Sequence, residues 1–599
     1  MKKVTVLLVI MVMLSLVGCS NTDAKRETSK FTGNIDKAYE EADMEKVKEE
    51  AGDTPEELAP NRERMLALYG ENKEIKTKDY DASLAAKTRT GTYVGKADDN
   101  KVVSWKGIPY AKQPVGDLRW RAPEEREDDD KVYEAYYFGH SSIQVEANDE
   151  ISSLYPQGED CLNLNIWNNR TDSSTKKPIM VWIHGGGFIQ GGTCDPIYEG
   201  THFVESNPDV LFVSIDYRTD ILGFINLSVV PGADDYDDSA NLGLLDEIAA
   251  LNWIKENALA FGGDPERITI FGESAGGGSC SALTIIPQAK GLFNRAIMES
   301  GSCVVLIRSA EKSIAQTKKL LEITGAKDIN DLKSLTADDL RKAADVLGGG
   351  SAINYTLPQL DGITLPTDIK AAFDSNQRNG IDIMVGSTQN EYNLWTIAEG
   401  KEQNRLSMSA DFMTLFLRMS EEDRKNYIEF LGNLDTDDDY EMLLRTIDYV
   451  AFHGPNRYEA KTHADHGQNA YVYYFTEEST NMELLSYHGF ELEFVFDNID
   501  SKEVADIKKA EKLSDIMQQM WVNFAKSGDP SIKEGDLPGV GAIKWDKYTS
   551  ENHNVMVLNS ENPHQQVDPI QSNLDLIGNL FWTRYNVPNY ENLFLLATN

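Results

Sequence analysis

The chain has 599 residues, of which 41% are hydrophobic and 9% aromatic, so it can bury a large globular core. Its 97 acidic and 58 basic residues give a formal net charge of −39. This excess of acid argues against nucleic acid and anionic lipid head groups as partners, and indicates a strongly solvated exterior.

The first 18 residues have the pattern of an export signal. A positive start, MKK, is followed by the apolar run VTVLLVIMVMLSLV, and the small-residue end LVGC places Cys19 after Gly18. This end resembles a bacterial lipobox, in which the cysteine is lipidated and becomes the new N-terminus. We expect residues 1–18 to be a lipoprotein signal peptide, Cys19 to carry the lipid, and the protein to be anchored to a bacterial membrane outside the cytoplasm. A single membrane helix is the alternative, for which the apolar run is short.

Residues 19–87 are rich in charged residues and alanine. The stretch NIDKAYEEADMEKVKEEAGDTPEELAP predicts short charged helices that end at Gly52 and Pro60, with few large apolar side chains to bury. We interpret these residues as a tether or spacer between the membrane and the main domain. A small partner-binding segment is the alternative.

Residues 88–599 predict one α/β domain. Apolar stretches predict strands, and LGLLDEIAALNWIKENALAFGG predicts a helix that ends at glycines. Strands that alternate with helices indicate a mostly parallel sheet. The segments 306–350 and 400–470 are largely helical and charged, and we expect them to be cap insertions above the strand ends. The predicted strands lie within KPIMVWI (177–183), DVLFVSI (209–215), ITIF (268–271), RAIMES (295–300), IDIMVGS (381–387) and AYVYYF (470–475).

The stretch FGESAGGGS, residues 271–279, places Ser274 between Gly272 and Gly276, after a predicted strand and before a predicted helix. A serine hydroxyl is a weak nucleophile that needs a base and oxyanion donors. A sharp strand-to-helix turn exposes such a serine and leaves no room for side chains two residues away. We interpret Ser274 as the candidate nucleophile. A glycine-rich structural turn is the alternative.

The stretch HGGGF, residues 184–188, is the candidate source of oxyanion donors. Glycines let backbone N–H groups approach a ligand, and we assign the hole to the amides of Gly186, Gly187 and Ala275. No G-x-G-x-x-G fits over this stretch, which argues against a dinucleotide site. A purely structural glycine turn remains the alternative.

Six of the nine histidines follow Ser274, and the order expected for this arrangement is serine, acid, histidine. His488 precedes an apolar segment and has a glycine beside it, so it is the best candidate base. Glu391 follows the predicted strand at 381–387, whereas Asp382 stands at the wrong end of that strand. Spacing alone leaves other surface residues open for both roles.

Several long stretches in this order resemble the type B carboxylesterases, the carboxylesterase–lipase family that includes the cholinesterases. The resemblance covers nearly the whole chain from about residue 88 to the end. The stretches that carry it are GIPYAKQPVGDLRWRAPE, EDCLNLNIW (159–167), FGGDPERITIFGESAG (261–276), NEYNLW, HGFELEFVF and WVNFAKSGDP (521–530). The resemblance implies an α/β-hydrolase fold and hydrolysis of carboxylic esters through an acyl-enzyme. It implies Ser274, Glu391 and His488 as the triad, with the oxyanion hole at Gly186, Gly187 and Ala275. No cofactor or metal is needed.

The sequence departs from the family at two points. In many animal members the cysteine equivalent to Cys161 bonds to an upstream cysteine, and none lies between Cys19 and Cys161 here. Residues 133–158 contain no tryptophan, so the choline site of cholinesterases is not implied. The alternatives are a surface binding or adhesion protein on the same fold, or a hydrolase of thioester, amide or carbamate bonds.

Two acidic runs, DTDDDYE and DDYDD, raise the question of calcium. In the first, Tyr440 stands where an EF-hand loop requires glycine, and Thr446 stands where it requires glutamate. The second has no loop pattern. We interpret both as solvated loops.

Overall fold

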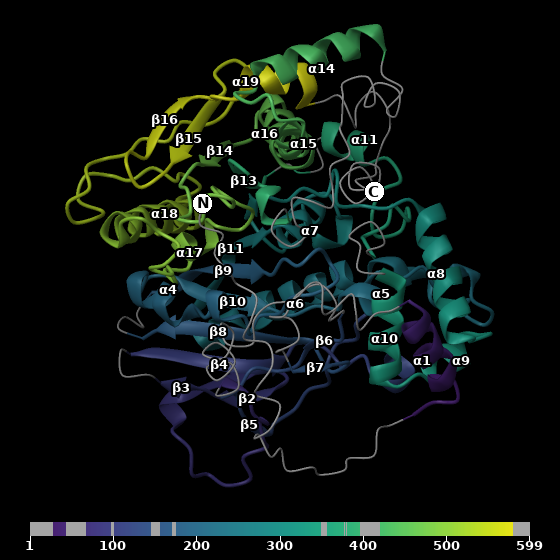
Figure 1. The fold of residues 1–599 in the computed structure, drawn as a ribbon. Coiled ribbons are helices and arrows are strands. Elements are labelled where there is room, and N and C mark those ends of the chain that lie inside the picture. Colours follow the sequence, from purple (N-terminus) through teal and green to yellow (C-terminus); the bar gives the residue numbers. More distant parts are fainter. Residues whose placement is uncertain are drawn as a thin grey trace, which may run out of the picture.

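The computed structural model shows a central sheet with helices on both sides (Figure 1). It describes residues 28–42, 68–97, 101–144, 156–170, 175–348, 356–375, 378, 380–395 and 420–578. The expected signal peptide, Cys19 and the predicted helical segment at 400–419 lie outside these residues.

Within the described ranges the main sheet has 11 strands. Six parallel pairings join β15, β14, β13, β12, β11, β9 and β10, and the strands outside them run antiparallel to their neighbours. The mostly parallel sheet is therefore confirmed. In sheet order the strands are β16 (His564–Val567), β15 (Asn554–Leu558), β14 (Ala470–Phe475), β13 (Asp382–Thr388), β12 (Arg295–Glu299), β11 (Gly263–Glu273), β9 (Lys177–Ile183), β10 (Leu211–Ile215), β8 (Asn163–Asn169), β4 (Val102–Pro109) and β3 (Lys96–Ala97).

Alternate side chains of each central strand enter opposite cores. On β9, Val181 and Ile183 join the core that contains α6 (Leu242–Asn257), α7 (Ala275–Leu283) and α16 (Gly454–Asp465). Trp182 joins the other core, with α4 (Gly200–Ser206), α17 (Leu492–Val495) and α18 (Ile507–Ser527). Because both faces are covered, the central strands are largely buried and apolar, which is why the sequence predicts them clearly.

Short strands flank the main sheet. One three-stranded sheet and one two-stranded pair lie toward its β4 side (Figure 1). They are β1 (Ala85–Thr88), β2 (Gly91–Val94) and β5 (Val132–Glu134), and β6 (Ser141–Ser142) with β7 (Gln157–Gly158).

The two inserted segments are helical where the structure describes them. The first is α8 (Ala310–Thr324), α9 (Ile329–Lys333) and α10 (Ala337–Gly348). The second is α14 (Glu421–Asn433), α15 (Asp439–Ile447) and a π-helical turn, Asp448–His453, that leads into α16. Shorter helices are α5 (Asp220–Gly223), α11 (Ile369–Asp374) and α19 (Gln571–Asn573).

The spacer is helical at residues 32–41, as predicted, but this helix is docked on the domain. These residues form α1 (Thr32–Glu41), which packs against α8 and α10, beside which it lies in Figure 1. Phe31, Ile35 and Tyr39 are buried in this contact, and Thr32 donates to Asp339 at 2.8 Å. These three apolar residues recur every four positions, so they form one helical stripe that is long enough to dock. The predicted domain start at residue 88 is late, because β1 begins at Ala85 and Tyr69 and Glu74 already form bridges with Phe138 and Tyr133.

The parallel strands direct the candidate residues to one edge of the sheet. The glycines of HGGGF follow β9, Ser274 follows β11 and Glu391 follows β13. His488 lies in the connection after β14. Residues at the carboxyl ends of neighbouring parallel strands lie close together, as in other open α/β sheets.

Candidate active site

Ser274 occupies a sharp turn between β11 and α7. Its backbone has φ 55° and ψ −120°, a conformation that non-glycine residues rarely adopt. The turn is fixed on both sides, because Ser274 N donates to Glu299 O at 2.8 Å and Gly278 N donates to Ser274 O at 2.9 Å. The turn therefore presents the serine at the start of a helix, where backbone N–H groups are unpaired.

The glycines around Ser274 are required by close backbone approach. A Cβ on Gly276 would lie 2.0 Å from Ile183 O, and one on Gly272 would lie 2.5 Å from the same atom. These contacts confirm the reason given from sequence for the two glycines. Gly301, which sequence reasoning did not single out, is equally constrained, because a Cβ there would lie 1.9 Å from Ser274 O.

Glu391 and His488 are in direct contact. His488 Nδ1 lies 2.6 Å from Glu391 Oε2, and His488 N donates to Glu391 O at 3.2 Å. The other carboxylate oxygen, Oε1, accepts from Ser300 Oγ at 2.6 Å and from Thr388 N at 2.8 Å. Glu391 is fully buried, so these donors fix both its position and that of the imidazole.

Three more buried glutamates, Glu273, Glu299 and Glu491, lie near this pair, so the site holds four with Glu391. Burial raises the pKa of each, and the neighbouring carboxylates raise the pKa of Glu273 further. Four such groups cannot all be ionised in one dry site. Donors converge on both oxygens of Glu391 alone, so a single negative charge is best held there.

The ring of His488 lies between aromatic side chains and a second carboxyl group. The centroids of Trp395 and Phe452 are 4.9 and 5.0 Å from its own. Its Nε2 lies 3.0 Å from Glu273 Oε1, without the alignment of a hydrogen bond. Burial lowers the pKa of His488 to about 4, against the opposing effect of Glu491 and Asp448. The imidazole is thus neutral at pH 7, as a general base must be.

The glycine loop, defined here as residues 184–191, follows β9 and faces Ser274. Gly186, Gly187, Phe188 and Gly191 have φ of 103°, 63°, 65° and 103°. A Cβ on Gly186 would lie 2.3 Å from Gln190 O, so the loop folds tightly on itself.

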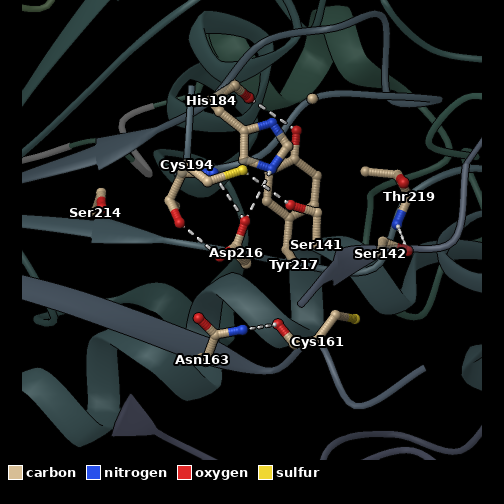
Figure 2. A network of polar contacts seen from close by, with 12 residues as sticks. Ser141, Ser142, Cys161, Asn163, His184, Cys194, Ser214, Asp216, Tyr217 and Thr219 are labelled. Carbon is tan, nitrogen blue, oxygen red and sulfur yellow. Dashed lines mark hydrogen bonds and ion pairs between the residues drawn. The ribbon is translucent and has the colours of Figure 1, made fainter. Parts of the chain in front are cut away.

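A buried polar network lies beneath the glycine loop (Figure 2). Tyr217 donates to His184 O at 2.9 Å, and Asp216 accepts from Thr193 N and Oγ1 at 2.9 and 2.6 Å. Burial raises the pKa of Asp216 to about 7, an effect that its bonds to Thr193 oppose. Burial lowers the pKa of His184 to about 4, and its ring bonds to Gly185 O at 2.8 Å. His184 is therefore a neutral structural group in this network.

One cavity of about 330 Å³ brings the candidate residues together. Ser274, His488, Gly186 and Gly187 line it, and Ala275 is the first residue of the helix behind the serine. Glu391 lies behind His488 and is not part of the wall. The remaining wall combines apolar and aromatic residues with polar groups that include Asp195, Glu273 and Arg308. The apolar and aromatic residues include Ile189, Val305, Leu306, Leu357, Leu394, Trp395, Ala451 and Phe452.

Sequence reasoning missed the groups that support the site. Ser300, Glu299 and Glu491 have no motif that relates them to Glu391, and Trp521 donates to Glu299 Oε1 at 2.5 Å from a helix 222 residues away. The signal for Ser300 was its place at the carboxyl end of β12, beside the ends of β11 and β13. Cys161, Cys194, Cys280 and Cys303 are buried free thiols.

Comparison with known proteins identifies relatives over most of the chain. The model of the carboxylesterase family matches residues 83–574. A para-nitrobenzyl esterase of Bacillus subtilis (strain 168) is 34% identical over 479 residues, which cover 77% of this chain and 92% of that protein. A liver carboxylesterase of Sus scrofa is 30% identical over 494 residues, 75% of this chain and 84% of that protein.

Solved structures agree with these relatives. A carboxylesterase of Geobacillus stearothermophilus matches with a TM-score of 0.71 and 34% identity, over 82% of this chain and 99% of that chain. Esterases account for each of these matches, which do not favour a non-catalytic binding protein. The chain therefore belongs to the carboxylesterase family, and it is a carboxylic ester hydrolase with the α/β-hydrolase fold.

Proposed function

We propose that Ser274 is the nucleophile of this esterase, His488 its general base and Glu391 the acid that orients His488. His488 Nε2 takes the proton of the Ser274 hydroxyl while its oxygen attacks the ester carbonyl. The alcohol leaves with that proton, and an acyl-enzyme remains on Ser274. Water then attacks the acyl group by the same route and frees the acid. Glu391 stabilises the imidazolium through the 2.6 Å contact to Nδ1.

The backbone amides of Gly186, Gly187 and Ala275 are the proposed oxyanion donors. Two belong to the glycine loop and the third begins α7, so all three come from segments that meet at Ser274. Each donor of this kind stabilises the transition state by about 3 kcal/mol.

One observation carries this proposal. Ser274, held in its strained turn, and His488, bonded to a buried glutamate, stand on the wall of the same cavity as the glycine loop. A nucleophile, a base with its orienting acid and backbone donors are the parts that acyl transfer requires.

The cavity favours uncharged esters with short acyl chains. Its wall is mainly apolar, and about 330 Å³ is near the lower end of the range for small-molecule sites. We therefore expect the turnover of nitrophenyl esters to fall from acetate and butyrate to octanoate.

The test is hydrolysis of nitrophenyl acetate, butyrate and octanoate by the chain from residue 20, beside Ser274→Ala. We expect turnover that Ser274→Ala abolishes, and a preference for the two shorter esters. Turnover by the folded Ser274→Ala variant at the native rate would reject Ser274 as the nucleophile. A preference for octanoate would reject the proposed acyl size.

We also propose that the enzyme is a lipoprotein, anchored to a bacterial membrane through lipid on Cys19. The pattern of residues 1–19 supports this, and none of the helices in the described ranges is long and apolar enough to cross a membrane. Feeding cells an alkyne fatty acid should label the full chain and leave Cys19→Ser unlabelled. Equal labelling of both chains would reject lipidation at Cys19.

A further inference from the structure

We propose that Gln144 is a positioning residue that holds the glycine loop in the shape in which its amides meet the oxyanion. The inference rests on the proposed role of that loop. Gln144 lies outside the cavity and touches no reacting atom. It acts through the backbone of Gly191, at the far end of the loop.

The glycine loop needs support from outside. Four of its residues have positive φ, among them Phe188, which has a side chain and pays a steric cost for that conformation. Inside the loop, Ile189 N and Gln190 N both donate to Gly186 O, at 3.1 and 3.0 Å. These bonds close a turn but do not fix where the turn lies relative to Ser274.

The side-chain amide of Gln144 makes two hydrogen bonds to the backbone of Gly191, one through its oxygen and one through its nitrogen. Gly191 N donates to Gln144 Oε1 at 2.8 Å, and Gln144 Nε2 donates to Gly191 O at 3.0 Å. The same Nε2 donates to Ser142 O at 3.0 Å. Gln144 has an exposed fraction of 0%, and loss of its amide would remove the partner of both Gly191 groups.

The backbone of Gly191 connects Gln144 to the oxyanion donors by direct packing. A Cβ on Gly191 would lie 2.5 Å from Gly185 O and 2.6 Å from His184 Nδ1, so its backbone packs directly on the start of the loop. Gly186 in turn packs on Gln190 O. Fixing Gly191 therefore fixes the residues on both sides of the Gly186 and Gly187 amides.

A second connection runs from the same short segment to the middle of the loop. Ser142 Oγ accepts from Thr219 N at 3.1 Å, a bond drawn in Figure 2. The next residue, Asp220, donates its backbone N–H to Phe188 O at 2.7 Å. Residues 142–144 thus reach the loop at Gly191 directly and at Phe188 through one intermediate, which is the arrangement of a scaffold for the loop.

The chain offers a matched control for this grip. Gln113 holds Leu162 in the same way, with Nε2 donating to Leu162 O at 3.1 Å and Leu162 N donating to Oε1 at 3.0 Å. Leu162 does not line the cavity. Removal of the Gln113 amide costs two bonds to backbone groups and removal of the Gln144 amide costs three, but only Gln144 supports the glycine loop.

The test compares Gln144→Met and Gln113→Met in the enzyme that carries Ser274, with nitrophenyl butyrate as substrate. Methionine keeps the length of the side chain and loses the amide. We expect Gln144→Met to lower kcat/KM on the order of 10- to 100-fold, below the loss of a whole oxyanion donor. It should weaken a trifluoromethyl ketone, whose adduct with serine carries an oxyanion, by a similar factor. Binding of the matching methyl ketone, which forms that adduct poorly, should not change.

Gln113→Met should change kcat/KM by less than about threefold. A Gln144→Met enzyme that folds and equals Gln113→Met in kcat/KM and in trifluoromethyl ketone affinity would overturn the inference. Equal weakening of both ketones would also overturn it, because that result means a general change of the cavity.

Gln144→Glu provides a second test, because the introduced side chain differs from the native one by a single group. The introduced carboxylate keeps the acceptor for Gly191 N but has no hydrogen for Gly191 O. Burial raises the pKa of such a carboxyl, and its protonated form can donate again. The ratio of variant to native kcat/KM should therefore rise as the pH falls from 9 to 6. A ratio that is independent of pH in this range would contradict the inference, including where Gln144→Met does not fold.

The two proposals fail in different ways. Native activity that survives in Ser274→Ala would reject the proposed function itself. Activity that depends on Ser274 but not on Gln144 would reject only the inference about the loop.

Discussion

His488 packs against Trp395 and Phe452, while its two nitrogens face Glu391 and Glu273. The aromatic rings exclude water, and loss of water disfavours the charged imidazolium. Glu491 and Asp448 act in the other direction and raise the pKa of His488. The balance of these two effects sets the pH at which the base becomes protonated and inactive.

We predict that the acid limb of kcat/KM lies below pH 6. Burial lowers the pKa of His488 to about 4, below its ordinary value of 6.5, so the neutral base persists as the pH falls through 6. Trp395→Ala should admit water and move the acid limb upward, toward 6.5. Phe452→Leu keeps an apolar cover and should move it less. The measurement is kcat/KM for nitrophenyl butyrate from pH 4.5 to 9, and an acid limb above pH 7 in the native enzyme would contradict the prediction.

The groups that carry the proposed chemistry could be predicted from sequence because each stands in a local pattern. Ser274 lies between glycines after a strand, and His488 precedes a glycine. The only signal for Ser300 was its place at the end of a predicted strand, because its partner Glu391 lies 91 residues later and the sheet brings the two together. Gln144 gave no signal for the same reason, since its grip on Gly191 spans 47 residues.

At the scale of the elements, β9, β11 and α7 meet within backbone contact. The absence of side chains at Gly272 and Gly276 allows this close approach and the turn that carries Ser274. It also makes the site sensitive to single methyl groups.

We predict that Gly276→Ala abolishes activity or prevents folding. The new Cβ would lie 2.0 Å from Ile183 O, which is backbone and cannot rotate away. Gly432→Ala is the control, because Gly432 is also helical, in α14, and a Cβ there meets nothing within 4 Å. That change should leave activity intact. The measurements are ester turnover and the circular dichroism melt, and an active Gly276→Ala enzyme would refute the packing described here.

The helix α1 packs on the domain in a way that the sequence did not predict. The central strands and α6 were predicted because their apolar patterns are long. The apolar stripe of α1 holds only Phe31, Ile35 and Tyr39 among charged residues, and the surface that receives it, α8 and α10, lies about 300 residues later in the chain.

We predict that Ile35→Ala releases α1. The Ile35 side chain is fully buried, and removing such a group costs about 2–5 kcal/mol, which is comparable to the stability of one docked helix. Limited proteolysis should then cleave within residues 28–42 faster than in the native protein. Lys37→Ala, at a side chain that is 73% exposed, should not change cleavage. Equal cleavage of all three proteins would show that α1 is not held by this contact.

At the scale of the whole molecule, the charge of −39 is distributed over a solvated exterior, whereas the four glutamates near Ser274 are kept from water. A buried carboxyl with a raised pKa stabilises the folded state fully below the pKa of the unfolded chain, and this contribution is lost as the pH rises toward the raised value. The site therefore makes the protein less stable at alkaline pH.

We predict that Glu299→Gln raises the relative stability of the protein as the pH increases from 5 to 9. Burial raises the pKa of Glu299 well above its ordinary range, and the amide has the same shape but no titration. The amide oxygen can still accept from Trp521. The difference in unfolding free energy should grow by up to about 1.4 kcal/mol per pH unit. The measurement is urea unfolding of both proteins at pH 5, 7 and 9, and a difference that does not grow would show that Glu299 is ionised in the native state.

Covalent labelling by a fluorophosphonate, which reacts with activated serines, tests directly whether Ser274 is the nucleophile and His488 its base. Mass spectrometry of the intact protein and its peptides gives the number of labels and their position. We predict one label per chain, on the peptide that contains Ser274, none in Ser274→Ala, and much slower labelling in His488→Ala. A native protein that takes no label, or takes it on another serine at the same rate in all three proteins, would contradict this prediction.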